Sequence, residues 1–183
     1  MKFLNEIGPR EADFIDAQHV FFVATAPLSA DGHVNLSPKG YASFARLDAN
    51  TVAYIDLGGS GIETHAHLRE NGRICLMFCA FEGDPLILRL YGTGRGHQYG
   101  TPEFHALRHH FPKIEVPVRG IIEVSVTSVQ RSCGFAVPNY EFLSDREQLK
   151  EHNAKRNQQE FIAHRISTNG RSIDDLPGLE SME

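Results

Sequence analysis

Short runs of β-branched and aromatic residues, separated by turn-forming residues, recur along most of the chain. Some six such runs predict strands, and they cover residues 19–28, 33–37, 51–57, 73–81, 86–99 and 120–134, with 41–44 as a further candidate. The last run alternates apolar and polar residues with a period near two, as a half-buried strand should. Six short strands with hairpin turns and only a few helices predict an antiparallel barrel, because closure removes exposed strand edges.

Two loops predict hairpins within this sheet. Asp31 and Gly32 form a two-residue turn candidate, since both residues tolerate positive φ, and this turn would pair residues 33–37 antiparallel with the preceding strand. Residues 82–85, with the sequence EGDP, predict a second hairpin with a longer loop.

Helices are few and short. Besides a helical opening segment, Ser60 is a candidate cap for a helix that closes at Asn71 and Gly72, and Pro102 fits the first position of another helix. The sequence SDRE at 144–147 has the capping-box pattern, which predicts that 149–165 forms the longest helix. Its charges favour a solvated face, and the alternative is a lid over a pocket, with Tyr140 and Phe142 near its base.

Length and composition limit the function. A chain of 183 residues predicts a single domain over 1–183, with a C-terminal helix and tail over 144–183. The net charge of −5 and the lack of a basic run argue against nucleic-acid binding. Neither a bilayer-length apolar run nor a secretion signal is present in the sequence, so we expect no membrane partner and a cytoplasmic protein. Three cysteines do not form a disulfide framework.

Two groups of hydrogen-bond donors are candidates for binding one phosphate. Ser37 and Lys39 form the first group, and the predicted helix start at Ser60 and Gly61, with Thr64 one turn in, forms the second. A helix N-terminus offers free N–H groups and partial positive charge, and a lysine adds a full charge. Ordinary turn and cap chemistry also explains every one of these residues, and composition alone favours that interpretation.

Histidines raise the possibility of a metal. His105 and His109 have the helical spacing of two ligands on one face, and His65 and His67 lie close together in sequence. No glutamate occupies the metalloprotease position between His105 and His109, and we expect no metal site.

Three ordered motifs resemble those of the pyridoxamine 5'-phosphate oxidase-related family, the FMN-binding split β-barrels. They are FFVATAPLSADGHVNLSPKGY, YIDLGGSGIETHAHLRENGRICLMF and LRLYGTGR, with a looser likeness over VQRSCGFAVP. The resemblance implies a six-stranded antiparallel split barrel that forms a homodimer, with FMN at the subunit interface and a small-molecule substrate.

The resemblance also implies roles for individual residues. Ser37 and Lys39 match the strand that faces the phosphate and ribityl chain, and Ser60, Gly61 and Thr64 match the phosphate-binding helix start. The remaining matches are Tyr54, Ile55 and Asp56, whose strand backbone lies along the flavin ring, and Arg131, Ser132 and Cys133, which face the ring from the partner subunit.

Some positions depart from the pattern of true pyridoxamine phosphate oxidases. His33 stands where those enzymes have an arginine, and Ser60-Gly61-Ile62-Glu63 stands where they have Ser-Arg-Lys. The chain also contains no tryptophan, which those enzymes carry in a C-terminal segment over the substrate. Weaker phosphate binding and a substrate other than vitamin B6 are expected.

The resulting hypothesis is an FMN-dependent oxidoreductase that moves hydride or electrons between a reduced donor and a small organic acceptor. A flavin carries such chemistry itself, so no conspicuous acid, base or nucleophile is required. In this hypothesis Arg131 stabilises negative charge on the reduced flavin. The alternative is a non-catalytic protein that binds flavin, deazaflavin or haem.

Overall fold

A computed structural model describes residues 2–181, and within them eight strands join in one antiparallel sheet. The strand order is β3-β2-β6-β7-β8-β5-β4, with β1 added along β8. The strands are β1 (Lys2–Leu4), β2 (Phe21–Thr25), β3 (Asn35–Lys39), β4 (Phe44–Arg46), β5 (Thr51–Asp56), β6 (Arg73–Cys79), β7 (Ile87–Gln98) and β8 (Gly120–Ser132). The helices are α1 (Pro9–Asp16), α2 (Glu63–Asn71), α3 (Pro102–Leu107), α4 (Gln148–Asn153) and α5 (Gln158–Thr168), and a 3-10 turn (Arg108–His110) follows α3.

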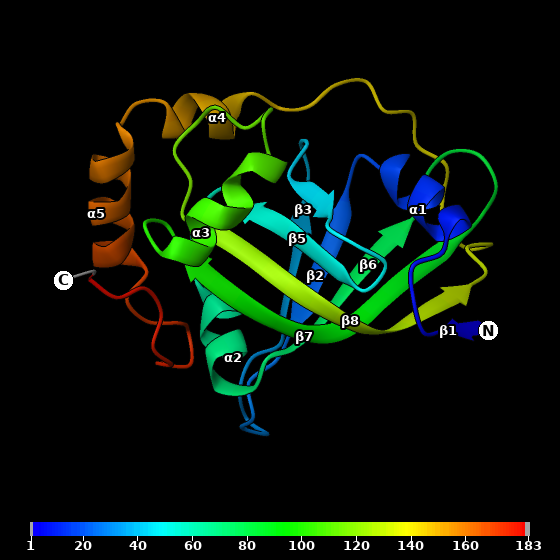
Figure 1. Cartoon of the computed structure of the whole chain (residues 1–183), viewed down its shortest axis with the longest axis horizontal. Coiled ribbons are helices and arrows are strands. Elements are labelled where there is room, and N and C mark those ends of the chain that lie inside the picture. The colour runs from blue at the N-terminus through cyan, green and yellow to red at the C-terminus, as the bar shows by residue number, and fades with distance from the viewer. Residues whose placement is uncertain (1, 182–183) are drawn as a thin grey trace.

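The long strands β7 and β8 curl the sheet into a half-barrel (Figure 1). A register shift between Tyr91 and Gly92 interrupts their pairing, and such bulges bend a strand and increase its twist. Gly92 fits here because a Cβ would lie only 2.2 Å from the Ser125 carbonyl oxygen. The predicted antiparallel split barrel is confirmed. The six expected strands are joined by the short strands β1 and β4, of which β1 was not predicted.

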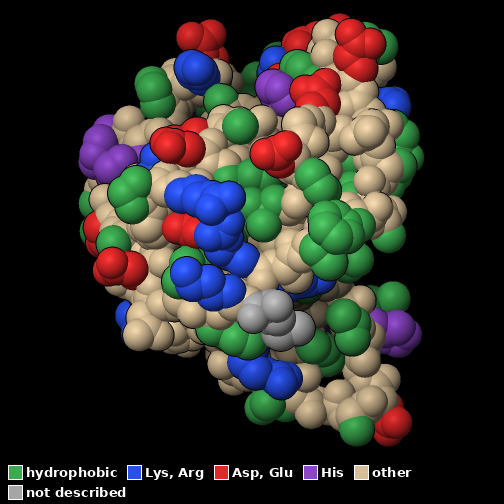
Figure 2. Space-filling view, turned by 90° about the vertical axis from the view of Figure 1, so that its right-hand side faces the viewer, with side chains coloured by type: hydrophobic (Ala, Val, Ile, Leu, Met, Phe, Trp, Pro, Cys, Tyr) green, Lys and Arg blue, Asp and Glu red, His purple; other side chains and the backbone are tan. Residues whose placement is uncertain are grey.

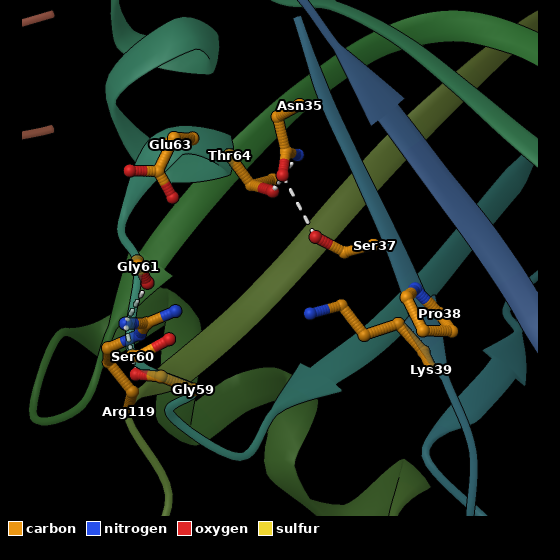
Figure 3. A pocket seen from close by; sticks show the side chains of 10 residues that line it. All are labelled: Asn35, Ser37, Pro38, Lys39, Gly59, Ser60, Gly61, Glu63, Thr64 and Arg119. Atoms are coloured by element: carbon orange, nitrogen blue, oxygen red, sulfur yellow. Dashed lines mark hydrogen bonds between the residues drawn. The ribbon is translucent and has the colours of Figure 1, made fainter. Parts of the chain in front are cut away.

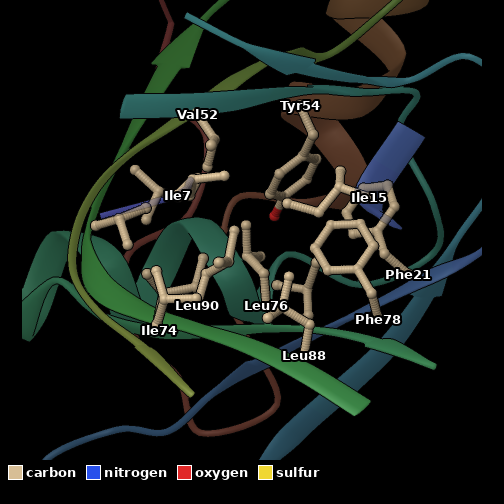
Figure 4. Packing of buried hydrophobic residues seen from close by; sticks show 14 of the residues in the cluster. Ile7, Ile15, Phe21, Val52, Tyr54, Ile74, Leu76, Phe78, Leu88 and Leu90 are labelled. Atoms are coloured by element: carbon tan, nitrogen blue, oxygen red, sulfur yellow. The ribbon is translucent and has the colours of Figure 1, made fainter. Parts of the chain in front are cut away.

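Two apolar clusters hold the sheet. The first fills the inside of the curl, where Phe21 packs edge-on against Tyr54 with ring centroids 5.6 Å apart (Figure 4). The second cluster lies between the other face of β5 and β8 and the α3 region, and it includes Ile55, Phe104 and Ile121. Strand β5 is therefore covered on both faces, which explains its nearly continuous apolar sequence.

Several predicted turns and caps are wrong. Thr25 pairs with Asn35, so the β2–β3 hairpin has a long loop rather than a two-residue turn at Asp31 and Gly32. Helix α2 begins at Glu63 with Ile62 at its N-cap, so Ser60 is not the cap. The predicted end of α2 is confirmed, because Gly72 adopts the left-handed conformation with φ +71°.

The C-terminal region differs from the predicted single helix. The region predicted as one helix over 149–165 is divided between α4 and α5. The capping box lies at Asn157 and Glu160 instead of 144–147. Charged side chains between 145 and 156 are exposed or half-buried, as a solvated face requires. Helix α5, by contrast, buries Phe161 and Arg165 against the loop after β5. Within residues 2–181, no helix has the length and apolarity needed to span a bilayer.

Candidate functional site

A pocket of about 500 Å³ opens between the edge strand β3 and the loop that joins β5 to α2 (Figure 3). Five of the predicted site residues line it, and they come from both candidate donor groups. The lining residues are Asn35, Ser37, Pro38, Lys39, Gly59, Ser60, Gly61, Glu63, Thr64 and Arg119. The structure thus brings the two predicted donor groups together.

Strand alternation places the polar residues of β3 on one side. Asn35, Ser37 and Lys39 are two residues apart, and side chains at this spacing share a face. The Asn35 amide donates to Thr64 Oγ1 at 3.1 Å, and Ser37 Oγ donates to Asn35 Oδ1 at 2.9 Å. Pro38 is compatible with this strand because β3 is at the sheet edge, where a missing N–H does not interrupt a ladder.

Lys39 supplies a cation to the pocket. Its side chain extends from β3 toward the loop (Figure 3). No carboxylate of residues 2–181 lies within ion-pair distance of its ammonium group. A lysine without a carboxylate partner, lining a concave site, is suited to an anionic ligand.

The loop opposite Lys39 supplies backbone donors. The N–H groups of Ser60, Gly61 and Ile62 donate to no other residue in the described part of the chain. They lie just before α2, where the helix dipole adds partial positive charge. The space beside Gly59 is open, since a Cβ there would meet no atom within 4 Å.

A buried charge network anchors the base of the loop. Arg119 Nε donates to Asp56 Oδ2 at 2.8 Å, and His65 Nε2 donates to the same oxygen at 2.9 Å. Burial alone would raise the pKa of Asp56, but the Arg119 guanidinium and the His65 hydrogen bond hold that pKa well below its usual range. Burial lowers the pKa of His65, so its ring is neutral near pH 7. Asp56 therefore supports the loop from inside the protein and does not line the pocket.

Tyr54 and Ile55 are buried in the two apolar clusters. Their backbones pair with Ile122 and Ile121 of β8, and neither residue lines the pocket. Burial raises the pKa of the Tyr54 hydroxyl far above its usual range. Their role beside a flavin ring stays a prediction.

Arg131 and Ser132 lie at the far end of β8 from Arg119. They line a different pocket with Cys133, and Arg131 Nη1 lies 3.3 Å from Glu11 Oε1. On the face at the N-terminal end of the molecule, basic and acidic side chains lie side by side (Figure 2). Within one chain these residues do not reach the Lys39 pocket, and a contribution from a partner subunit stays a prediction.

Five pocket residues were not predicted as site residues, and they are Asn35, Pro38, Gly59, Glu63 and Arg119. Asn35 has the two-residue spacing from Ser37 that could have revealed it. Arg119 directly precedes β8 and its backbone N–H donates to the Asp56 carbonyl at 2.8 Å, a pairing that is visible only once the strand order is known. His33 is held away from the pocket by Asp174, whose Oδ1 lies 2.6 Å from His33 Nδ1.

The histidines do not form a metal centre in the described structure. Across residues 2–181, no three His, Cys, Asp or Glu side chains converge in a way that could hold a metal ion. His67 is fully buried with Nδ1 3.0 Å from Thr25 Oγ1, and His65 is committed to Asp56.

A mainly antiparallel sheet curled into a half-barrel, with a few helices, defines the split β-barrel class. Residues 7–133 match the pyridoxamine 5'-phosphate oxidase family. The chain belongs to this family. It is 37% identical over 197 aligned positions to the pyridoxamine 5'-phosphate oxidase family protein ustO of Aspergillus flavus, covering 98% of this chain and 78% of the relative.

Solved structures show the same fold. HupZ from Group A Streptococcus has a TM-score of 0.54 and 24% identity, over 74% of this chain and 99% of that chain. An FMN-binding protein from Syntrophomonas wolfei has a TM-score of 0.50 and 14% identity, over 65% of this chain and 81% of that chain. At these identities the likeness concerns the fold alone.

Proposed function

We propose that the protein binds FMN, with the flavin phosphate in the Lys39 pocket, and acts as an FMN-dependent oxidoreductase on a small organic substrate. The observation that carries the proposal is that Lys39, Ser37 and two residues with free N–H groups, Ser60 and Gly61, line one pocket. Membership of the pyridoxamine 5'-phosphate oxidase family and the fold shared with an FMN-binding protein support the choice of a flavin.

The residues present fit a phosphate group. Lys39 provides one full positive charge, the loop provides backbone donors, and Ser37 provides a hydroxyl. The Asp56–Arg119 pair is charge-neutral and adds no net charge to the pocket. Glu63 is the unfavourable element, because its carboxylate also lines the pocket. We therefore expect FMN to bind more weakly than it would if position 63 carried a second basic residue.

A bound flavin would supply hydride or electron transfer between donor and acceptor. The chain's own contribution is to bind and orient the group. Lys39 and the loop N–H groups hold the phosphate end, and the Asn35–Thr64 hydrogen bond ties β3 to the start of α2. Strands β3 and β5 belong to the same sheet, which therefore carries both sides of the pocket.

The proposal includes a homodimer with the cofactor at the interface. Leu36 lies on β3 next to the pocket residues and is 64% exposed, and neighbouring Val34 is 73% exposed. Exposed apolar residues on an unpaired edge strand favour association with another chain. In the family resemblance this association also brings Arg131 and Ser132 of the partner toward the flavin.

An absorption spectrum of the purified protein, followed by FMN titration, tests the proposal. We expect flavin bands and a Kd for FMN that rises about 10- to 100-fold in Lys39→Gln, since a charge-assisted hydrogen bond contributes roughly 1.5–3 kcal/mol. Lys113→Gln is the matched control, because Lys113 is exposed and does not line the pocket.

The outcomes separate the candidate functions. Flavin bands that bleach with a reduced nicotinamide and recover with an acceptor support the oxidoreductase. Stable FMN binding without turnover indicates a flavin-binding protein. Absence of FMN binding contradicts the proposal, and titration with deazaflavin and haem then tests the other cofactors.

A further inference from the structure

The loop that lines the pocket is held from behind by the C-terminal segment, which lies outside the residues 7–133 that match the family. The Asn153 amide donates to the Leu57 carbonyl at 2.7 Å, and Arg165 Nη1 donates to the Gly59 carbonyl at 3.2 Å. The Asn169 amide donates to the Ser60 carbonyl at 2.9 Å. These three side chains therefore fix the carbonyl side of the loop.

Fixing the carbonyls also orients the N–H groups. The chain has no cis peptide bond in its described part, and in a trans peptide the C=O and the following N–H point in opposite directions. The bonds from Arg165 and Asn169 therefore turn the N–H groups of Ser60 and Gly61 away from the C-terminal segment. Gly59, Ser60 and Gly61 line the pocket, whereas Arg165 and Asn169 do not.

Arg165 is also a buried cation that lacks a counter-charge. The residue is only 8% exposed, and its Nε has no hydrogen-bond partner in the described structure. No carboxylate of residues 2–181 forms an ion pair with Arg165. The nearby Asp56 is already paired with Arg119 and His65. The Arg165 guanidinium carbon lies 5.0 Å from the centre of the Phe161 ring. Burying an unpaired charge is costly, and an anion on the other side of the loop would offset that cost.

We propose that Arg165, together with Asn169, positions the anion-binding loop and that the negative charge opposite buried Arg165 is the phosphate of the bound flavin. This role rests on the proposed function and extends it to the C-terminal segment, which lies outside the residues 7–133 that match the family. Arg165 does not touch the ligand. It acts through the Gly59 peptide and through its charge.

The test compares FMN with riboflavin, which carries the same ring without the phosphate. We expect Arg165→Met to lower the ratio of FMN affinity to riboflavin affinity about tenfold, with riboflavin affinity unchanged. Arg165→Gln, which keeps a donor for Gly59 but removes the charge, provides the same comparison if the Met variant does not fold. Arg165→Lys, which keeps the charge, should recover most of the ratio. Arg10→Met, on the exposed side of α1, is the matched control.

A purely structural role for Arg165 would weaken both ligands together and leave the ratio unchanged, and this result would overturn the inference. A wild-type protein that binds FMN and riboflavin equally would also overturn it, because no phosphate would then be recognised. A wild-type protein that binds neither flavin would refute the proposed function itself, and the inference would fail with it.

Discussion

Asp56 and Arg119 are joined through both backbone and side chain at adjacent ends of β5 and β8. The Arg119 N–H donates to the Asp56 carbonyl at 2.8 Å, while Nε and Nη2 donate to the two carboxylate oxygens at 2.8 and 3.2 Å. Arg119 Nη1 also donates to the Gly61 carbonyl at 2.7 Å. The pair therefore connects the barrel wall to the pocket loop.

Breaking this pair should cost much of the protein's stability. We expect Asp56→Asn to lower the free energy of unfolding by roughly 3–5 kcal/mol, because Arg119 would be left buried without its counter-charge. Urea denaturation measures the change. Asp16→Asn, which breaks an exposed pair with Arg46, is the control and should cost at most about 1 kcal/mol. Equal effects from the two substitutions would contradict the role given to the buried pair.

Stability should decline as the pH falls below about 6.5, the value for a histidine in the unfolded chain. Burial lowers the pKa of His65 in the folded protein, so the unfolded chain takes up a proton first, from its pKa of about 6.5. The free energy of unfolding therefore falls as the pH drops below that value. Urea denaturation at pH 7.5 and pH 5.5 checks this, and His65→Gln should show a smaller difference between the two pH values than wild type.

The exposed His105 provides the control for that experiment, and His105→Gln should keep the wild-type pH dependence. Asp56 contributes with the same sign at lower pH. Its folded pKa is depressed, so its stabilisation is complete above the unfolded value of about 3.9 and is lost as the pH falls through the folded pKa.

Gly96 is required by the close approach of the His65 ring. A Cβ at this position would lie 2.5 Å from His65 Nδ1, so Gly96→Ala must displace the ring from Asp56. We expect a loss of about 1–3 kcal/mol in the free energy of unfolding, as for other overpacked sites. Gly170→Ala, where the nearest atom to the new Cβ is 3.5 Å away, is the control. A folded Gly96→Ala protein with unchanged stability would show that the ring moves freely.

Leu36 tests the proposed dimer. A two-fold interface would bury it twice, so Leu36→Lys should weaken association by roughly 3–6 kcal/mol and shift the sedimentation coefficient to that of a monomer. Leu28→Lys alters an equally exposed leucine in the β2–β3 loop and should leave the dimer intact. A monomeric wild-type protein would refute the proposed interface.

The sequence predicted the parts of the site that depend on local patterns. Residues 33–37 and 51–57 were predicted as strands, and the structure has β3 over Asn35–Lys39 and β5 over Thr51–Asp56. Both strands exist, with β3 shifted by two residues and β5 shorter by one. Ser60 was wrongly predicted to be the N-cap of α2. Serine is a preferred N-cap residue, so a serine shortly before a helix suggests a cap even when another residue occupies that position.

The support of the loop was beyond sequence reasoning. Arg119 lies 63 positions after Asp56, and Asn169 lies 109 positions after Ser60, so only the folded chain brings these residues together. Local propensity carries no information about either contact. The split of the last helical region into α4 and α5, by contrast, has a local signal, because Asn157 and Glu160 form the capping box that begins α5.

Strand β8 pairs with β7, β5 and β1, and its register joins Lys2 to Arg131. During synthesis, a chain that ends before residue 120 therefore leaves β7 and β5 with unpaired edges that can pair with other chains. The barrel closes only after most of the polypeptide has been made, and such long-range pairing is intrinsically slow. Production of this protein should therefore suffer more from truncated or stalled chains than from changes on the surface of the finished fold.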